Sequence, residues 1–309
     1  MSILKYLNEN YPIRKSEKEK ERFRSYIIES LKKKNVEARV ETTNDKKNNN
    51  IVIGDPTKAK AVFCAHYDTP AMSPFPNIMI PKNKLVFYAY QFVPITFLVV
   101  VSLLFGWIVG EVIFNSYEAF LIMFMVAYYG MFFGIMRGFT NKYNYNDNTS
   151  GVATVLSIID EIPSERLSDF AFILFDNEEK GKKGSAAYFK DHKDEMKARF
   201  LINFDCVGNG ENIIFIAQKD AVDSDELEAL KKAFASGDGF NVDFCTYKEG
   251  QSNSDHKNFP KGVACVACKK TDGGLLYTPN IHTNKDTVAN DGNICYLAKK
   301  TALFINELA

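Results

Sequence analysis

Two histidines and several carboxylates follow apolar runs in this 309-residue sequence, and their residue types are those of a metal site. They are His66, Asp68, Asp147, Glu178, Glu179, Asp205 and His282. Imidazole nitrogen combined with carboxylate oxygen is the ligand set of a borderline cation, and it suits zinc better than calcium or magnesium. The adjacent acids at 178 and 179 would repel each other unless a cation or a shared proton compensates them. The residue types therefore predict a metal-binding cluster.

The spacing of these residues also allows plainer roles. Asp68 lies two residues after His66, so its carboxylate would point to the same side of a continuing strand and could fix the imidazole tautomer. Asp147 stands just before a helical pattern, where a simple N-cap is the alternative. A pair of acids is also common in a solvated turn, and His282 lies in a loop that begins near Pro279. Spacing alone leaves both interpretations open.

The apolar runs alternate with helical patterns, which is typical of an α/β fold whose sites lie at strand ends. Strands are predicted at 36–42, 50–53, 61–65, 170–175, 200–205, 213–217 and 263–267. Helices are predicted at 15–34, 152–162, 185–196 and 295–308.

Composition removes several classes of protein. The chain is 46% hydrophobic and 25% charged, which is globular, and its 38 basic residues match 38 acidic ones. Without an excess of Lys and Arg, we expect no nucleic-acid partner. Six scattered cysteines do not form a disulfide framework, so we expect reduced thiols, with Cys265 and Cys268 as small core residues.

Residues 85–136 differ from the rest because they contain only two charged residues, Glu111 and Glu118. Uncharged stretches of 26 residues (85–110) and 18 residues (119–136) would reach about 39 and 27 Å as helices, against roughly 30 Å of hydrocarbon. We therefore predict a two-span membrane hairpin in contact with lipid. Core helices of a soluble domain are the alternative. The flanking basic residues place both long ends in the cytoplasm by the positive-inside rule; they are Lys82, Lys84, Arg137 and Lys142.

Six motifs occur along the chain in the order of the dizinc aminopeptidases of peptidase family M28, which the sequence resembles. They begin at His66-Tyr-Asp68, Asp147-Asn-Thr-Ser-Gly151, Glu178-Glu179-Lys-Gly181, Asp205-Cys-Val-Gly208, Ser254-Asp255-His256 and His282-Thr-Asn-Lys-Asp286. The resemblance implies a phosphorylase/hydrolase-like three-layer α/β domain with a mixed central sheet. Its first part would be residues 1–84 and its second part residues 138–309, with the transmembrane hairpin inserted at 85–137.

The resemblance also implies roles for the site residues. Asp147 would bridge two divalent metal ions, expected to be zinc. His282 and Glu179 would complete one metal site, and His66 and Asp205 the other. Asp68 would orient His66, and Glu178 would be the general base. Asp255 and His256 match a region near the substrate pocket, for which a structural role at a helix start is the alternative.

The function expected from these features is a membrane-anchored, zinc-dependent exopeptidase in the cell membrane that faces the cytoplasm and removes amino-terminal residues from peptides. A glutaminyl cyclase-like acyltransferase with one zinc is an alternative within enzymes. A non-catalytic membrane receptor or scaffold of the same fold, and a hairpin that forms part of a transporter, are alternatives of other classes. The sequence leaves open the direction of cleavage, the preferred residue, the native metal, the physiological peptide and the oligomeric state.

Overall fold

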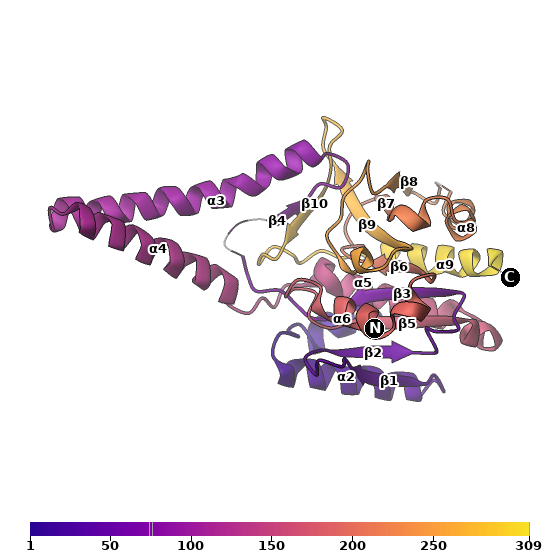
Figure 1. Cartoon of the computed structure of the whole chain (residues 1–309). Coiled ribbons are helices and arrows are strands. Elements are labelled where there is room, and N and C mark those ends of the chain that lie inside the picture. The colour runs from indigo at the N-terminus through magenta and orange to yellow at the C-terminus, as the bar shows by residue number, and fades with distance from the viewer. Residues whose placement is uncertain (74, 76, 236, 309) are drawn as a thin grey trace.

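The central sheet of the computed structural model is mixed (Figure 1). The structure describes residues 1–73, 75, 77–235 and 237–308, apart from the side chains of Met136 and Arg137, so one of the predicted flanking charges lies outside it. Within these residues, ten strands form one sheet in the order β1-β2-β5-β3-β6-β9-β10-β4, and β7 pairs with β9 and β8. The strands are β1 (Ala38–Thr42), β2 (Asn49–Ile53), β3 (Ala61–His66), β4 (Asn77–Met79), β5 (Phe170–Phe175), β6 (Phe200–Phe204), β7 (Asn212–Ala217), β8 (Asn241–Thr246), β9 (Gly262–Lys270) and β10 (Leu276–Ile281).

The middle of the sheet is parallel and buried on both faces. β3 pairs in parallel with β5 and β6, and β6 pairs in parallel with β9. Because strand side chains alternate between faces, Phe63 packs into one core while Val62 and Cys64 pack into the other. Burial on both faces explains why these strands appear in the sequence as continuous apolar runs.

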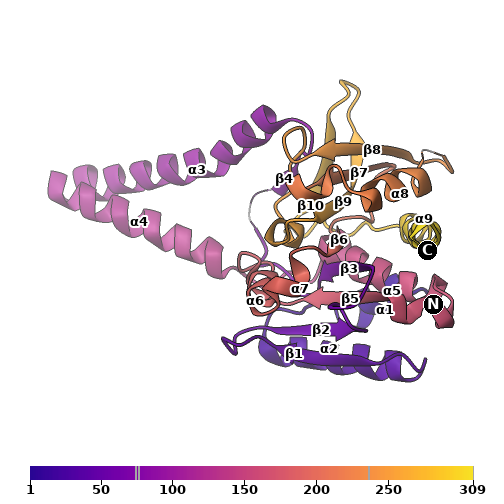
Figure 2. The ribbon, with the colours of Figure 1, turned by 45° about the vertical axis from the view of Figure 1, so that its right-hand side comes forward.

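Helices cover both faces of the sheet (Figure 2). One core cluster receives side chains from α1, α2, α5, α8 and α9, and a second receives Tyr188 of α6 and Met196 of α7. The bounds are α1 (Ile3–Asn10), α2 (Glu17–Lys32), α5 (Gly151–Glu161), α6 (Lys183–Asp191), α7 (Lys193–Met196), α8 (Asp225–Ala233) and α9 (Asp291–Glu307). The predicted α/β class with a mixed central sheet is confirmed.

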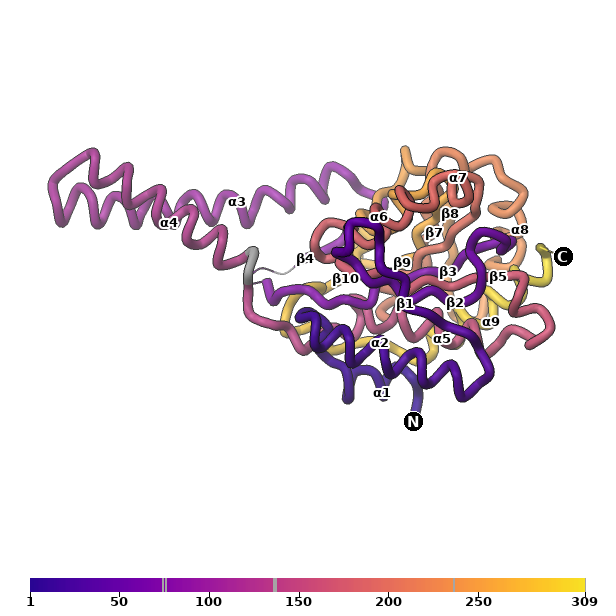
Figure 3. Tube along the Cα trace, turned by 60° about the horizontal axis from the view of Figure 1, so that its bottom comes forward, coloured from indigo at the N-terminus to yellow at the C-terminus, as the bar shows by residue number. Residues whose placement is uncertain are grey.

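Two long apolar helices project from this body as a hairpin (Figures 1 and 3). α3 (Lys84–Gly106) continues into a π-helical segment, Trp107–Ile113, and α4 spans Tyr117–Arg137. Both helices are long and apolar enough to cross a membrane. The protein buries few of their side chains; Phe92 is 64% exposed and Val126 is 59% exposed. The connection is shorter than the predicted 111–118 because the helix continues through Ile113.

Several elements differ from the prediction. The helix predicted at 185–196 is divided at His192, where the backbone leaves the helical region. α1, α8, β4, β8 and β10 were not predicted. β10 is only partly buried and contains Thr278, Pro279 and Asn280, so it lacks a strand-like apolar pattern. The six cysteines are free, and Cys265 and Cys268 are buried in β9, as expected.

Candidate metal centre

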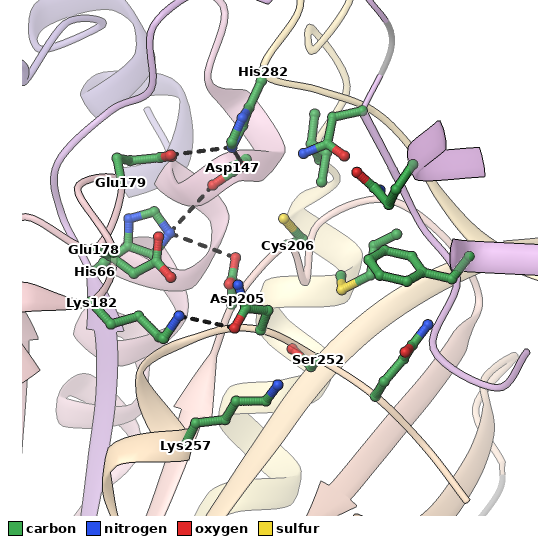
Figure 4. A pocket seen from close by; sticks show the side chains of 18 of the residues that line it. His66, Asp147, Glu178, Glu179, Lys182, Asp205, Cys206, Ser252, Lys257 and His282 are labelled. Atoms are coloured by element: carbon green, nitrogen blue, oxygen red, sulfur yellow. Dashed lines mark hydrogen bonds and ion pairs between the residues drawn. The ribbon is translucent and has the colours of Figure 1, made fainter. Parts of the chain in front are cut away.

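The predicted metal ligands converge on one site (Figure 4), and several of them follow the carboxyl ends of parallel strands. His66 is the last residue of β3, Glu178 and Glu179 lie in the loop after β5, and Asp205 directly follows β6. His282 directly follows β10. Since β3, β5 and β6 run in the same direction, their ends lie at one edge of the sheet, where open α/β proteins bind ligands.

Asp147 lies between the two imidazoles. Its Oδ1 is 3.3 Å from His66 Nε2, and its Oδ2 is 3.0 Å from His282 Nε2. His66 Nε2 is also 3.7 Å from Asp205 Oδ1, and His282 Nε2 is 3.2 Å from Glu179 Oε2. Each oxygen of Asp147 therefore faces its own imidazole and carboxylate pair.

These contacts define two groups that share Asp147. Asp147 with His66 and Asp205, and Asp147 with Glu179 and His282, each place three ligand atoms within 4.8 Å of one another. A third group, His66 with Glu178 and Glu179, meets the same condition. Glu178 is thus near enough to the centre either to bind a cation or to act on a neighbouring atom.

The Asp147 carboxylate can face the two imidazoles because a neighbouring residue caps the helix. Asn148 Oδ1 accepts a hydrogen bond from the backbone N–H of Gly151 at 3.0 Å, at the first turn of α5. The simple N-cap alternative for Asp147 is therefore wrong. A Cβ atom on Gly151 would lie 2.2 Å from the carbonyl oxygen of Phe204, so glycine permits the close approach of α5 to the end of β6.

Three side chains join the Asp147 loop to the loop after Asp205. The backbone N–H groups of residues 206, 207 and 208 donate in turn to Asn148 Oδ1 (3.2 Å), Ser150 Oγ (3.1 Å) and Asn146 Oδ1 (2.7 Å). From the other side, Asp286 accepts the N–H of Asn146 and of Asp147, both at 3.0 Å. All these groups are buried, so the loop has a defined position at the centre.

Asp68 contacts His66 through its main chain and the acid pair through its side chain. His66 Nδ1 lies 3.2 Å from the Asp68 carbonyl oxygen, which leaves Nε2 facing Asp147, whereas the Asp68 carboxylate is 3.6 Å from Nδ1. The carboxylate accepts the N–H of Glu178 at 2.9 Å and of Glu179 at 3.2 Å. Asp68 therefore positions the acid pair as well as the imidazole.

Two buried cations support the centre from behind, and sequence reasoning missed both. Lys20 Nζ is 2.7 Å from Asp176 Oδ1, two residues before Glu178. Arg14 is fully buried; Nη2 donates to Thr149 Oγ1 at 3.1 Å, and Nε donates to the carbonyl of Tyr67. Burial lowers the pKa of Arg14 to about 10, but this value is still above neutral pH, so the guanidinium remains charged.

Burial and mutual repulsion shift the titrations of the central groups. Burial raises the pKa of Glu178 well above its usual range, and the carboxylates around it add to that shift. Burial would also raise the pKa of Asp147, but the two imidazoles hold it well below the ordinary value. Burial disfavours charge on His66 and His282, yet the neighbouring carboxylates outweigh this and raise both pKa values. The centre as a whole therefore attracts positive charge.

The donor set fits a divalent cation of the zinc type. Two buried carboxylate oxygens, Glu179 Oε1 and Asp205 Oδ1, have no hydrogen-bond partner among the residues described. Buried polar atoms are normally satisfied, so these two are available as ligand atoms. Nitrogen and oxygen donors from His66 and His282 together with carboxylates match zinc chemistry.

The centre opens into a cavity of about 530 Å³, within the usual range for small-ligand sites. Its lining includes Lys182 and Lys257, which were not predicted, and Phe87, Tyr88 and Gln91 from the first turns of α3. The lysines had no motif to mark them, and the α3 residues had been assigned to the membrane span.

Asp255 and His256 are not brought to the lining of this cavity. Both are fully buried in a single helical turn, Asp255–Asn258, and Asp255 Oδ1 accepts a hydrogen bond from Ser185 Oγ of α6. Burial lowers the pKa of His256 to about 3, so this imidazole is neutral. The turn Asp255–Asn258 directs the side chains of Asp255 and His256 into the protein, so they do not reach the cavity.

Residues 138–299 match the model of Peptidase family M28, which is more than half of the chain. The chain belongs to peptidase family M28. No curated protein matches it.

Solved structures share the fold of this family member at low sequence identity. The Legionella pneumophila LapA aminopeptidase aligns with a TM-score of 0.56 and 17% identity, over 99% of this chain and 69% of that one. A Zn-dependent exopeptidase from Parabacteroides distasonis ATCC 8503 aligns at 0.55 and 16%, over 98% and 95%. A glutaminyl cyclase from Porphyromonas gingivalis aligns at 0.56 and 13%, over 100% and 98%. Aminopeptidases and cyclases thus share this architecture.

Replacing Asp68 with Asn is expected to weaken zinc binding about 10- to 100-fold. The amide retains one acceptor but presents an NH₂ group to the other backbone N–H, which displaces Glu178 or Glu179. Competition against a chelator measures the affinity. Asp291→Asn, an exposed residue at the start of α9, is the matched control. Unchanged zinc affinity in Asp68→Asn would show that the acid pair needs no such support.

Replacing Phe87 with Ala is expected to raise KM for peptides roughly 10-fold, which corresponds to about 1.4 kcal/mol of lost contact. Zinc content should stay the same, because Phe87 lines the cavity outside the two ligand groups. Phe92→Ala, on the same helix but not in the cavity lining, is the control. Equal KM values for both variants would mean that α3 does not contact substrate.

Proposed function

We propose that this M28 protein is a membrane-anchored, zinc-dependent exopeptidase that removes amino-terminal residues from peptides. The observation that carries the proposal is the position of Asp147, whose two oxygens face separate imidazole and carboxylate pairs. A single carboxylate shared in this way suits a bridge between two cations. His66 with Asp205, and His282 with Glu179, would complete the two sites. The fold shared with zinc exopeptidases supports the proposal.

When bound, two zinc ions supply Lewis-acid chemistry, polarising the scissile carbonyl and lowering the pKa of water in the site. Glu178 belongs to neither of the two ligand groups that share Asp147, so its carboxylate is available for proton transfer. Its carboxylate would take a proton from the attacking water and deliver it to the amine leaving group. Burial raises the pKa of Glu178 above its usual range, which suits a group that must both accept and release a proton. Asp68 would hold the Glu178 backbone in position for this transfer.

The peptidase domain is proposed to consist of residues 1–84 and 138–309, with residues 85–137 crossing the membrane as a hairpin. Strands from both parts alternate in one sheet, since β3 of the first part lies between β5 and β6 of the second. The exposed apolar surface of α3 and α4 would lie in lipid. The basic residues that flank the hairpin support a cytoplasmic peptidase domain.

Glu178→Gln is expected to retain about two zinc equivalents and lose turnover by roughly 10²- to 10⁴-fold. The full chain in detergent is assayed with unblocked, amino-blocked and carboxyl-amidated peptides, with and without added zinc. Blocking the amino end should abolish cleavage. Near-normal hydrolysis by Glu178→Gln would remove it as the base. Cyclisation of a peptide with amino-terminal glutamine would instead favour the cyclase alternative.

The topology is tested with a reporter that is active only outside the cell. Fused after residue 309 it is expected to be silent, and inserted at 115–116, between the helices, it is expected to be active. Reversed signals would place the peptidase domain outside. Signal at neither position would contradict a membrane-spanning hairpin.

A further inference from the structure

The catalytic cavity has a cationic wall in addition to its cluster of acids. Lys182 and Lys257 both line it, and their ammonium groups lie toward the opposite end of the site from His282 and Glu179 (Figure 4). Lys182 precedes α6, and Lys257 lies in the turn Asp255–Asn258. Two elements that are far apart in the sequence thus bring like charges to one wall.

Neither lysine is neutralised by a carboxylate in the part of the chain that the structure describes. Lys182 Nζ donates to Asn253 Oδ1 at 2.9 Å, which fixes its position and leaves further N–H donors available. No ion pair involves Lys257 among the described residues. Burial lowers the pKa of Lys257, and the charges of Lys182 and Lys84 add to that shift. The wall therefore holds like charges close together without an internal counter-ion.

The charge balance of the cavity favours an anionic ligand at this wall. Four carboxylates line the cavity: Asp147, Glu178, Glu179 and Asp205. Two divalent cations, as in the proposed function on which this inference rests, would compensate these four charges. The charges of Lys182 and Lys257 then remain. A substrate anion would be attracted by this field and would stabilise the two ammonium groups.

We propose that Lys182 and Lys257 bind a carboxylate of the substrate. The substrate class is then short peptides whose carboxylate lies close to the scissile bond. This carboxylate is either the free α-carboxylate of a di- or tripeptide or an acidic side chain after the cleaved bond. Lysine binds such a group as a point charge with several donors. The apolar surfaces of Phe87 and Tyr88 on the α3 wall would accept an uncharged side chain of the same peptide.

The test measures binding separately from hydrolysis. The probe is an uncleavable reduced-amide analogue of leucyl-alanine, as the free acid and as the carboxamide, titrated calorimetrically into the zinc-loaded full chain in detergent. The free acid is expected to bind at least about 10-fold more tightly. Lys182→Gln/Lys257→Gln should abolish this preference without changing affinity for the carboxamide. Lys257→Arg, in the otherwise native chain, should retain part of the preference.

Lys183→Gln is the matched control, because Lys183 is exposed and does not line the cavity. A carboxamide analogue of leucyl-glutamate distinguishes the two sources: binding as tight as the free acid indicates side-chain recognition, and weak binding indicates the α-carboxylate. The inference is overturned if the free acid and the carboxamide of the leucyl-alanine analogue bind equally and the leucyl-glutamate carboxamide binds no more tightly than they do, or if none of the three binds. Hydrolysis of the corresponding peptides is scored separately, so loss of activity with an intact carboxylate preference would reject the proposed function alone.

Discussion

Collecting four carboxylates and two imidazoles around one cavity is the constraint on which the rest of this structure depends. Like charges at this separation repel strongly where water is scarce. The protein places its fully buried cations one layer farther out, with Lys20 on Asp176 and Arg14 behind the Asp147 loop. Backbone N–H groups stabilise Asp68 and Asp286. Asp147, Glu179 and Asp205 instead face imidazole nitrogens at 3.0 to 3.7 Å, an arrangement that a bound cation would complete.

Most of the inner residues were predictable because each follows an apolar strand, and parallel strand ends meet at one edge of a sheet. The roles of Gly151 and Asn148 are visible only in the structure. Gly151 allows α5 to approach the end of β6 closely, and Asn148 caps α5. Arg14 was not predictable, since nothing in its local sequence indicates that it is buried behind a loop more than 130 residues away. Lys182 and Lys257 were also missed because single lysines have no distinctive spacing. Asp255 and His256 point into the protein and not into the cavity, and the sequence did not show in which direction their helical turn would face.

The apolar hairpin is connected to the site through the segment that leads into it, which contacts β10 and His282. β4, which leads into α3, pairs with β10, and β10 ends next to His282. The backbone N–H of Ser73 also donates to the carbonyl of His282 at 2.7 Å. The chain that enters the hairpin thus passes along the strand that carries one predicted ligand. The first turns of α3 then form part of the cavity wall, so a displacement of the hairpin would change the cavity and the position of His282 together.

The number of cations can be argued from the symmetry around Asp147. If one cation occupied the His66 and Asp205 pair, the His282 and Glu179 pair would still hold an imidazole 3.0 Å from Asp147 and 3.2 Å from Glu179. In the proposed function, that imidazole would then depend on a proton shared with the two carboxylates that face it. A second dication removes the need for the proton and uses the unpartnered Oε1 of Glu179 as well. Two cations, as proposed, would therefore serve both imidazole and carboxylate pairs in the same way, whereas a single cation would leave the second pair dependent on protonation.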